Sequence, residues 1–214
     1  MSKLSTEQIT EAIQTALKDR KKRKFVESLD FQVMLRDYNP NTEKRFNSAT
    51  TLNYPIKFSM KFCIIGTMGH VEEAKAAGHE GILVDDLKKF NDEGKLIKKW
   101  ARNFDVILVS DSKNKDVTKM IGRYITAIGK LPVTIHEKEK VVDKTNEMLR
   151  TIRFRVKKFP WLGQSFGIDS LPEENLRQNL TKSVNFLVSL LPKGWQNIKT
   201  IHIKTSMGKP IKLY

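Results

Sequence analysis

The sequence predicts a two-domain protein of mixed α+β and α/β class, in which an α/β domain is inserted into a split α+β domain. Residues 1–55 and 148–214 contain segments in which apolar and polar side chains alternate, as in half-buried strands. Within 56–147, short apolar strands are separated by helical segments, which indicates βαβ units and a parallel sheet. A difference in charge between the two parts supports the same division.

The N-terminal part of the split domain should contain one helix and two strands. Ser5 followed by Gln8 has the spacing of a capping box and predicts a helix over 6–19. Leu29, Phe31, Val33 and Leu35 alternate with polar residues and Met34, so 29–35 should be a strand with one buried face. A second short strand is expected over 48–52.

The C-terminal part should contain three strands and one long helix. A strand over 152–157 is expected to form a hairpin with a strand near 162–168. Pro172 should occupy the first turn of the following helix, with Ser170 as its cap. A last strand over 198–204 should stop near Gly208 and Pro210, because proline cannot donate to a strand ladder.

The inserted part alternates strands and helices. Its expected strands lie at 60–65, 82–84 and 106–109, and its expected helices lie at 72–77, 87–104 with a break at Gly94, 116–124 and from Val141 onward.

A net charge of +15 is the main indication of the partner. Residues 1–55 hold ten basic and seven acidic side chains, residues 148–214 hold twelve and three, and the insert holds seventeen and fourteen. The split domain therefore carries +12 and the insert +3. Such a surplus favours a polyanion, held mainly by the split domain, with affinity that falls as salt rises.

Composition excludes several other classes of protein. A single cysteine, Cys63, allows no internal disulfide and no cysteine cluster for zinc, and it fits a reducing compartment. No apolar segment approaches the roughly 20 residues of a membrane helix, and the N-terminus has no apolar signal segment. We therefore expect a cytosolic or nuclear protein with no membrane partner.

The C-terminal stretch Lys204–Tyr214 combines groups that suit close contact with a sugar–phosphate chain. Thr205 and Ser206 supply hydroxyls, Met207 a flexible thioether, Gly208 an open backbone, and Lys209 a positive charge. The alternative is a strand end followed by a frayed tail.

A second candidate segment precedes the first strand. Lys24 ends a basic run that begins at Lys18, which is either a solvated face or a nuclear import signal. Phe25 could stack on a base, although a phenylalanine at a strand start is more often part of the core. Glu27 could accept a hydrogen bond from a base amine or a 2′-hydroxyl, or it could fix a neighbouring arginine.

Arg153, Arg155 and Lys157 share one face of a predicted strand, which is either a binding face or an exposed face of the sheet.

The sequence contains few motifs that would indicate an enzyme. The turn Gly66-Thr67-Met68-Gly69 lacks the pattern of a nucleotide-binding loop, and the histidines are scattered. Asp85-Asp86 at a strand end is expected to cap a helix rather than bind a metal.

Four separated stretches carry a resemblance to a known family. They are Arg23-Lys24-Phe25-Val26-Glu27-Ser28, Asn185-Phe186-Leu187-Val188-Ser189-Leu190-Leu191, Trp195-Gln196-Asn197, and Lys204-Thr205-Ser206-Met207-Gly208-Lys209-Pro210 with Leu213-Tyr214. These four stretches occur in the order and at the spacing that the family shows. The chain therefore resembles, end to end, the universal L-one family of large-subunit ribosomal proteins in its eukaryotic (L-ten-a) form.

The resemblance implies a split RNA-binding α+β domain that carries an inserted Rossmann-like three-layer α/β domain. It further implies binding to a folded junction of large-subunit ribosomal RNA (rRNA), which forms the mobile stalk beside the exit site and helps release deacylated transfer RNA (tRNA). No catalysis and no cofactor are implied. The implied partners are rRNA, transient exit-site tRNA and other ribosomal components, with no homo-oligomer. The implied location is the cytoplasmic ribosome, after nuclear and nucleolar passage during assembly.

By position, Lys24, Phe25, Glu27 and Ser28 match the family's first RNA-contacting segment. Ser206, Met207 and Gly208 match its Thr/Ser-Met-Gly motif, flanked by Thr205 and Lys209, and Arg155 and Lys157 match less specifically. The chain departs from the family at 120–132, where a Gly/Pro-rich loop is usual. Two other functions stay open, a ribosome-assembly factor with the same RNA-binding domain and a nucleotide-dependent enzyme.

Overall fold

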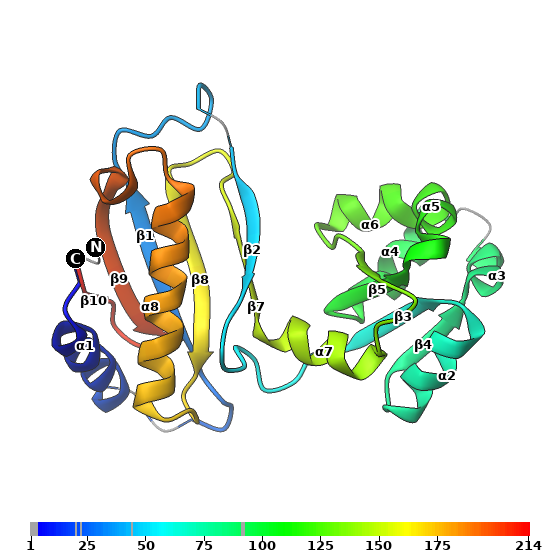
Figure 1. The fold of residues 1–214 in the computed structure, drawn as a ribbon, viewed down its shortest axis with the longest axis horizontal. Coiled ribbons are helices and arrows are strands. Elements are labelled where there is room, and N and C mark those ends of the chain that lie inside the picture. The colour runs from blue at the N-terminus through cyan, green and yellow to red at the C-terminus, as the bar shows by residue number, and fades with distance from the viewer. Residues whose placement is uncertain (1–3, 20, 22, 44, 91–92) are drawn as a thin grey trace. The chain divides into compact units, whose positions relative to one another are not determined.

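The computed structural model describes residues 4–19, 21, 23–43, 45–90 and 93–214. The chain divides into two compact units (Figure 1). The first unit comprises Met1–Phe58 and Leu149–Tyr214, and the second comprises Ser59–Met148. The prediction of a mixed α/β fold is confirmed.

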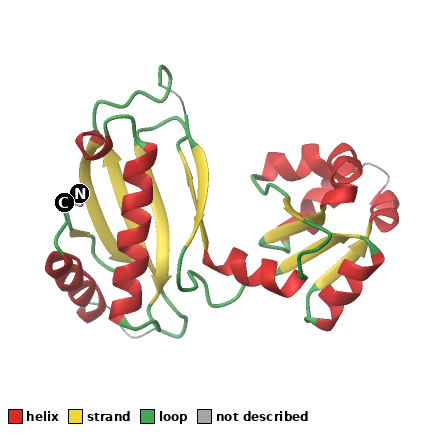
Figure 2. Ribbon diagram, in the orientation of Figure 1, coloured by secondary structure: helices red, strands yellow, loops and turns green. Residues whose placement is uncertain are grey.

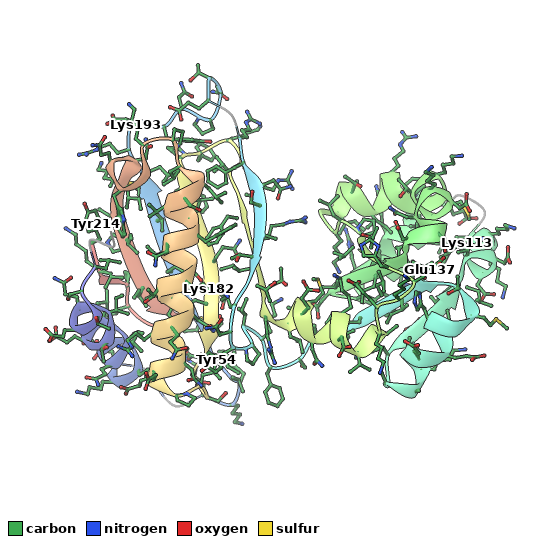
Figure 3. All side chains as sticks on the ribbon, in the orientation of Figure 1. Tyr54, Lys113, Glu137, Lys182, Lys193 and Tyr214 are labelled. Atoms are coloured by element: carbon green, nitrogen blue, oxygen red, sulfur yellow. The ribbon has the colours of Figure 1, made fainter. Side chains whose placement is uncertain are left out.

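An antiparallel four-stranded sheet forms the centre of the first unit, in the order β10-β9-β1-β8. Its strands are β1 (Ser28–Leu35), β8 (Trp161–Ile168), β9 (Ile198–Thr205) and the short β10 (Ile211–Lys212). The last segment of the chain is therefore not a frayed tail. It turns back after β9, and Tyr214 accepts a hydrogen bond from the Ile201 backbone at 3.1 Å. Figure 3 shows Tyr214 at the edge of this sheet.

The alternation predicted for β1 separates a buried face from an outer face. Leu29, Phe31, Val33 and Leu35 are all buried, whereas Gln32 and Met34 are exposed. Phe31 lies at the centre of the core, with ring centroids 6.0 Å from Phe154 and 6.1 Å from Phe166. The hydrophobic effect thus fixes which face of β1 points inward.

Two helices cover the inner face of this sheet (Figure 2). α1 (Thr6–Lys18) begins with the predicted capping box, in which Ser5 and Gln8 exchange hydrogen bonds of 3.2 Å. α8 (Glu173–Leu190) begins one residue later than its prediction. Its N-cap is Pro172 and makes no side-chain cap bond, so the expected cap by Ser170 was wrong.

A separate two-stranded sheet pairs β2 (Asn47–Thr51) with β7 (Thr151–Arg155). The predicted hairpin of β7 with β8 was wrong. β8 pairs instead along its whole length with β1, because its buried Leu162 and Phe166 complete the core around Phe31. β7 follows the outer edge of β8, and the Gln164 side chain donates to the Arg153 carbonyl oxygen at 2.7 Å.

A parallel four-stranded sheet forms the centre of the second unit, in the order β4-β3-β5-β6. Its strands are β3 (Phe62–Gly66), β4 (Glu80–Leu83), β5 (Val106–Ser110) and β6 (Val133–Ile135). All five residues of β3 are buried, as expected for a central strand with helices on both faces. The pattern of the sequence did not predict β6, which has only three residues.

Helices flank both faces of the parallel sheet, with α4 and α6 on one face and α2 and α7 on the other (Figure 1). The α-helices are α2 (Met68–Ala76), α3 (Val84–Leu87), α4 (Gly94–Arg102), α5 (Asn114–Val117), α6 (Arg123–Ile128) and α7 (Val141–Arg150). This unit also contains short 3₁₀ segments at Lys88–Phe90 and Asp111–Lys113 and a π segment at Thr118–Gly122. A further 3₁₀ segment, Gly194–Asn197, belongs to the first unit.

Within 120–132, where the sequence departs from the family pattern, residues 120–128 continue the helical segment rather than form an open loop. α6 ends at Ile128, and its C-cap Gly129 has a φ of 89°, a left-handed conformation that glycine adopts without strain. The Lys130 ammonium then donates to the carbonyl oxygens of Ala101 at 2.9 Å and Arg102 at 3.2 Å. The positive charge of Lys130 thereby offsets the partial negative charge that the helix dipole places at the C-terminal end of α4.

The Cys63 thiol should not react in the folded protein. The side chain is fully buried in β3, and burial, together with the nearby Glu80 charge, raises its pKa to about 12. Because the thiolate is the reactive form, we expect negligible labelling by a disulfide reagent at pH 8 and one thiol per chain in denaturant. Rapid labelling of the native protein would contradict the burial of β3.

Candidate RNA-binding surface

The segment before β1 and the turn after β9 meet at one end of the antiparallel sheet. Leu29 pairs with Thr205, and the Ser206 backbone N–H donates to the Ser28 carbonyl oxygen at 3.0 Å. The Ser28 N–H in turn donates to Ser206 Oγ at 3.2 Å, and the two hydroxyls lie 3.0 Å apart. Two predicted site segments, 178 residues apart in sequence, are therefore held together by reciprocal hydrogen bonds.

A tight turn presents Met207 to solvent. β9 ends at Thr205, earlier than the predicted stop near Gly208, and the Gly208 N–H donates back to the Thr205 carbonyl oxygen at 3.1 Å. A Cβ atom on Gly208 would lie 2.3 Å from Thr205 Oγ1, so this position requires glycine for close packing. Met207, at the top of the turn, is 64% exposed.

Glu27 lies just before β1 and is nearly fully buried, although its side chain is ionisable. Its Oε1 forms an ion pair of 2.9 Å with Arg23 Nε, which supports the interpretation that it fixes a neighbouring arginine. Its Oε2 has no hydrogen-bond partner among the described residues, and the same holds for the buried Thr205 Oγ1. A buried oxygen without a partner is costly, so both atoms are candidates to bind a ligand.

These side chains surround a cavity of about 430 Å³. Glu27, Thr205, Met207 and Gly208 line it together with the basic residues that precede β1. The full lining is Asp19, Lys21, Arg23, Glu27, Thr205, Met207, Gly208 and Lys209. The basic run that could have been only a solvated face therefore supplies two cations, Lys21 and Arg23, to this cavity.

Phe25 differs from its prediction in position and environment. β1 begins at Ser28, so Phe25 is not at the start of a strand. Phe25 is 54% exposed, which rules out the core role that is more usual for this residue type. Lys24 beside it is also exposed.

Arg155 and Lys157 do not join this cavity. β7 ends at Arg155, which pairs with Asn47, and both basic residues line a different cavity of about 560 Å³. That second cavity also contains Arg45, Lys158 and the exposed Phe159. It adjoins the Trp161 end of β8, whereas Ser28 pairs with Ile168 at the opposite end. Six residues of strand, about 20 Å, separate the two ends.

The comparisons with known proteins decide the family. Residues 17–209 match the model of the ribosomal protein L1p/L10e family. The chain belongs to this family. It is 38% identical over 216 residues to large ribosomal subunit protein uL1z of Arabidopsis thaliana and to large ribosomal subunit protein uL1 of Caenorhabditis elegans. It is 39% identical over 214 residues to large ribosomal subunit protein uL1 of Entamoeba histolytica. Each alignment covers the whole of both chains.

Membership of the L1p/L10e family confirms the resemblance found in the sequence and the prediction of a ribosomal protein rather than an enzyme. In the second unit, Gly66 ends β3 and Thr67 is the N-cap of α2, with no nucleotide-binding loop between them. The turn borders a cavity of about 620 Å³ that also contains Lys88, Lys113 and Lys119.

Asp85 and Asp86 lie in the first turn of α3, whose N-cap is Leu83, and the Asp86 carboxyl accepts a hydrogen bond from the Leu83 backbone. They form ion pairs of 2.7 Å with Lys88 and Lys89, which hold the pKa of both carboxyls below their usual range. Among the described residues, no group of three or more metal-ligating side chains is present. None of the described helices has the length and apolar character needed to cross a lipid bilayer.

Proposed function

We propose that this protein is a structural constituent of the large ribosomal subunit that binds a folded rRNA junction through its first unit. The observation that carries the proposal is the cavity between the segment before β1 and the turn after β9. It combines the cations Lys21, Arg23 and Lys209 with buried oxygens of Glu27 and Thr205. The names of its relatives, all of the large ribosomal subunit, support the same conclusion.

The cavity suits RNA because it offers partners for both the phosphate and the sugar. The cations attract phosphates, while the Glu27 carboxylate can accept a hydrogen bond from a ribose 2′-hydroxyl or a base amine. The Thr205 hydroxyl can donate or accept at the same place. Arg23 holds the Glu27 carboxylate in position through Oε1 and leaves Oε2 for the ligand. Together these groups recognise a folded RNA by shape.

The resemblance to the family suggests a wider role in translation. We propose that the protein and its rRNA junction form the mobile stalk beside the exit site and help to release deacylated tRNA. The second unit joins the first through only two chain crossings, at Phe58–Ser59 and Met148–Leu149, which suits a movable arm. Nucleolar passage before assembly into cytoplasmic ribosomes is part of the same proposal.

Sucrose-gradient fractionation of cell lysate tests the proposed location. We expect the protein in large subunits and in translating polysomes, in proportion to the other large-subunit proteins. A protein that sediments only with precursor particles and is absent from polysomes would instead be an assembly factor. Binding of a nucleotide in calorimetry would favour an enzyme built on the second unit.

The salt dependence of RNA binding should distinguish the two units. Replacing Lys21 and Lys209, which line the cavity, by glutamine should reduce the slope of log K against log salt by about 2, since about one counterion is released per phosphate contact. The matched variant Lys113→Gln with Lys119→Gln, in the second unit, should leave the slope unchanged. If filter-binding titrations show that the two double variants reduce the slope equally, the RNA is not held mainly by the first unit.

A further inference from the structure

The outer face of the antiparallel sheet is not covered by any described helix, because α1 and α8 both pack on the inner face. It carries two large apolar side chains that are open to solvent, Trp161 at 59% and Met34 at 46% exposed. An exposed tryptophan on a rigid strand is unusual in a surface without a partner, since burying an aromatic side chain is favourable. Neither residue belongs to the cavity described above.

The strand register arranges the outer face in three rows, because directly paired residues of an antiparallel sheet point to the same side. The first row is Trp161, Met34 and Thr200; the second is Gly163, Gln32, His202 and Lys212; the third is Ser165, Asp30 and Lys204. Gly163 places no side chain beside Trp161, and even an added Cβ would only touch Gln32 at 3.6 Å. On the Gly163 side, therefore, no side chain of β8 covers the Trp161 ring on this face.

The charge of this face fits a polyanion. Lys204 and Lys212 lie on the rows, and Arg153 and Arg155 point away from the core on the neighbouring β7. Among the paired residues of the three rows, Asp30 is the one acidic side chain, and its Oδ1 accepts a hydrogen bond from Ser28 Oγ at 3.1 Å. The third row thereby continues directly into the candidate RNA-binding surface at Ser28 and Ser206.

We infer that the outer face of this sheet is a second RNA-contacting surface, on which Trp161 stacks against the base of an unpaired nucleotide. Lys204 and Lys212, on more distant strands of this face, and the arginines of β7 attract phosphates elsewhere along the same RNA segment. Stacking on an aromatic side chain tolerates any base, because every base has a flat π-face. The inference rests on the proposed RNA-binding role and extends it, from a junction recognised by shape to an adjoining single-stranded segment.

Trp161→Ala in the full-length protein tests this inference. The affinity for an unstructured oligoribonucleotide of ten nucleotides, at fixed salt, should fall by about 5- to 150-fold, and Trp161→Phe should restore most of it. The affinity for inorganic polyphosphate, which has charge but no base, should not change. Phe58→Ala, at another exposed aromatic position (77%), is the matched control and should leave all affinities unchanged.

The outcomes separate the inference from the proposed function. If the protein binds the rRNA junction but Trp161→Ala has wild-type affinity for both the junction and the oligonucleotide, the inference is wrong and the proposed function stands. If the junction is not bound but the oligonucleotide is bound through Trp161, the inference stands alone. Unchanged RNA affinity together with loss of Trp161→Ala protein from purified subunits would assign the face to a neighbouring protein and overturn the inference.

Discussion

Met207→Asp is expected to weaken binding of the large-subunit rRNA junction by about a hundredfold or more, because a like charge at a close contact costs several kcal/mol. Met207 stands at the top of the turn and lines the cavity beside Lys209. A carboxylate there would face the phosphates of the ligand and would also compete with them for the neighbouring cations. The measurement is the dissociation constant of the junction at fixed salt.

The chain offers a closely matched control for this substitution. Met68 in the second unit is also 64% exposed, so Met68→Asp introduces the same charge at an equally accessible methionine. We expect Met68→Asp to bind the junction like the wild-type protein, and Met207→Leu to retain most of the affinity because its volume and polarity are similar. Equal affinities of Met207→Asp and Met68→Asp would remove the turn after β9 from the RNA-binding surface.

Phe31→Ala is expected to lower the free energy of unfolding of the first unit by about 3–5 kcal/mol, the usual cost of removing a buried aromatic ring. Phe31 is 1% exposed and contacts the rings of Phe154 and Phe166, which come from two other strands. Removing it opens a cavity where three strands meet under α8. Urea denaturation monitored by circular dichroism measures the change.

Phe58→Ala serves as the control for stability, since Phe58 is 77% exposed and lies outside this core. Its effect should stay within about 0.5 kcal/mol, as is usual for surface positions. A small effect of Phe31→Ala, similar to that of Phe58→Ala, would mean that the N- and C-terminal segments do not share one core.

Periodicity in the sequence predicted which face of a strand is buried better than it predicted which strands pair with each other. The alternation in β1 identified the four residues that are buried, because a side-chain period of two is a local property. The pairing of β8 with β1 rather than with β7 depends on contacts between segments 130 residues apart, which no local pattern contains. The same limit explains why β10, a two-residue strand defined only by its pairing with β9, was not predicted.

The candidate site shows a similar division between local and non-local information. The hydroxyl, methionine and glycine of the last turn could be recognised from sequence as a close-contact motif. The burial of Glu27 and the participation of Lys21 and Arg23 could not be recognised, because they depend on how the segment before β1 folds against Thr205. The placement of Arg155 and Lys157 at the far end of the sheet likewise follows from strand register.

Ultraviolet crosslinking of the full-length protein to rRNA in cell lysate, followed by identification of the crosslinked peptides and nucleotides, tests the central claim most directly. If the two ends of the chain form one RNA-binding surface, peptides from 19–28 and from 204–209 should both crosslink, and to neighbouring nucleotides of one large-subunit junction. Crosslinks found only within 59–148, or to two unrelated RNAs from the two segments, would contradict it.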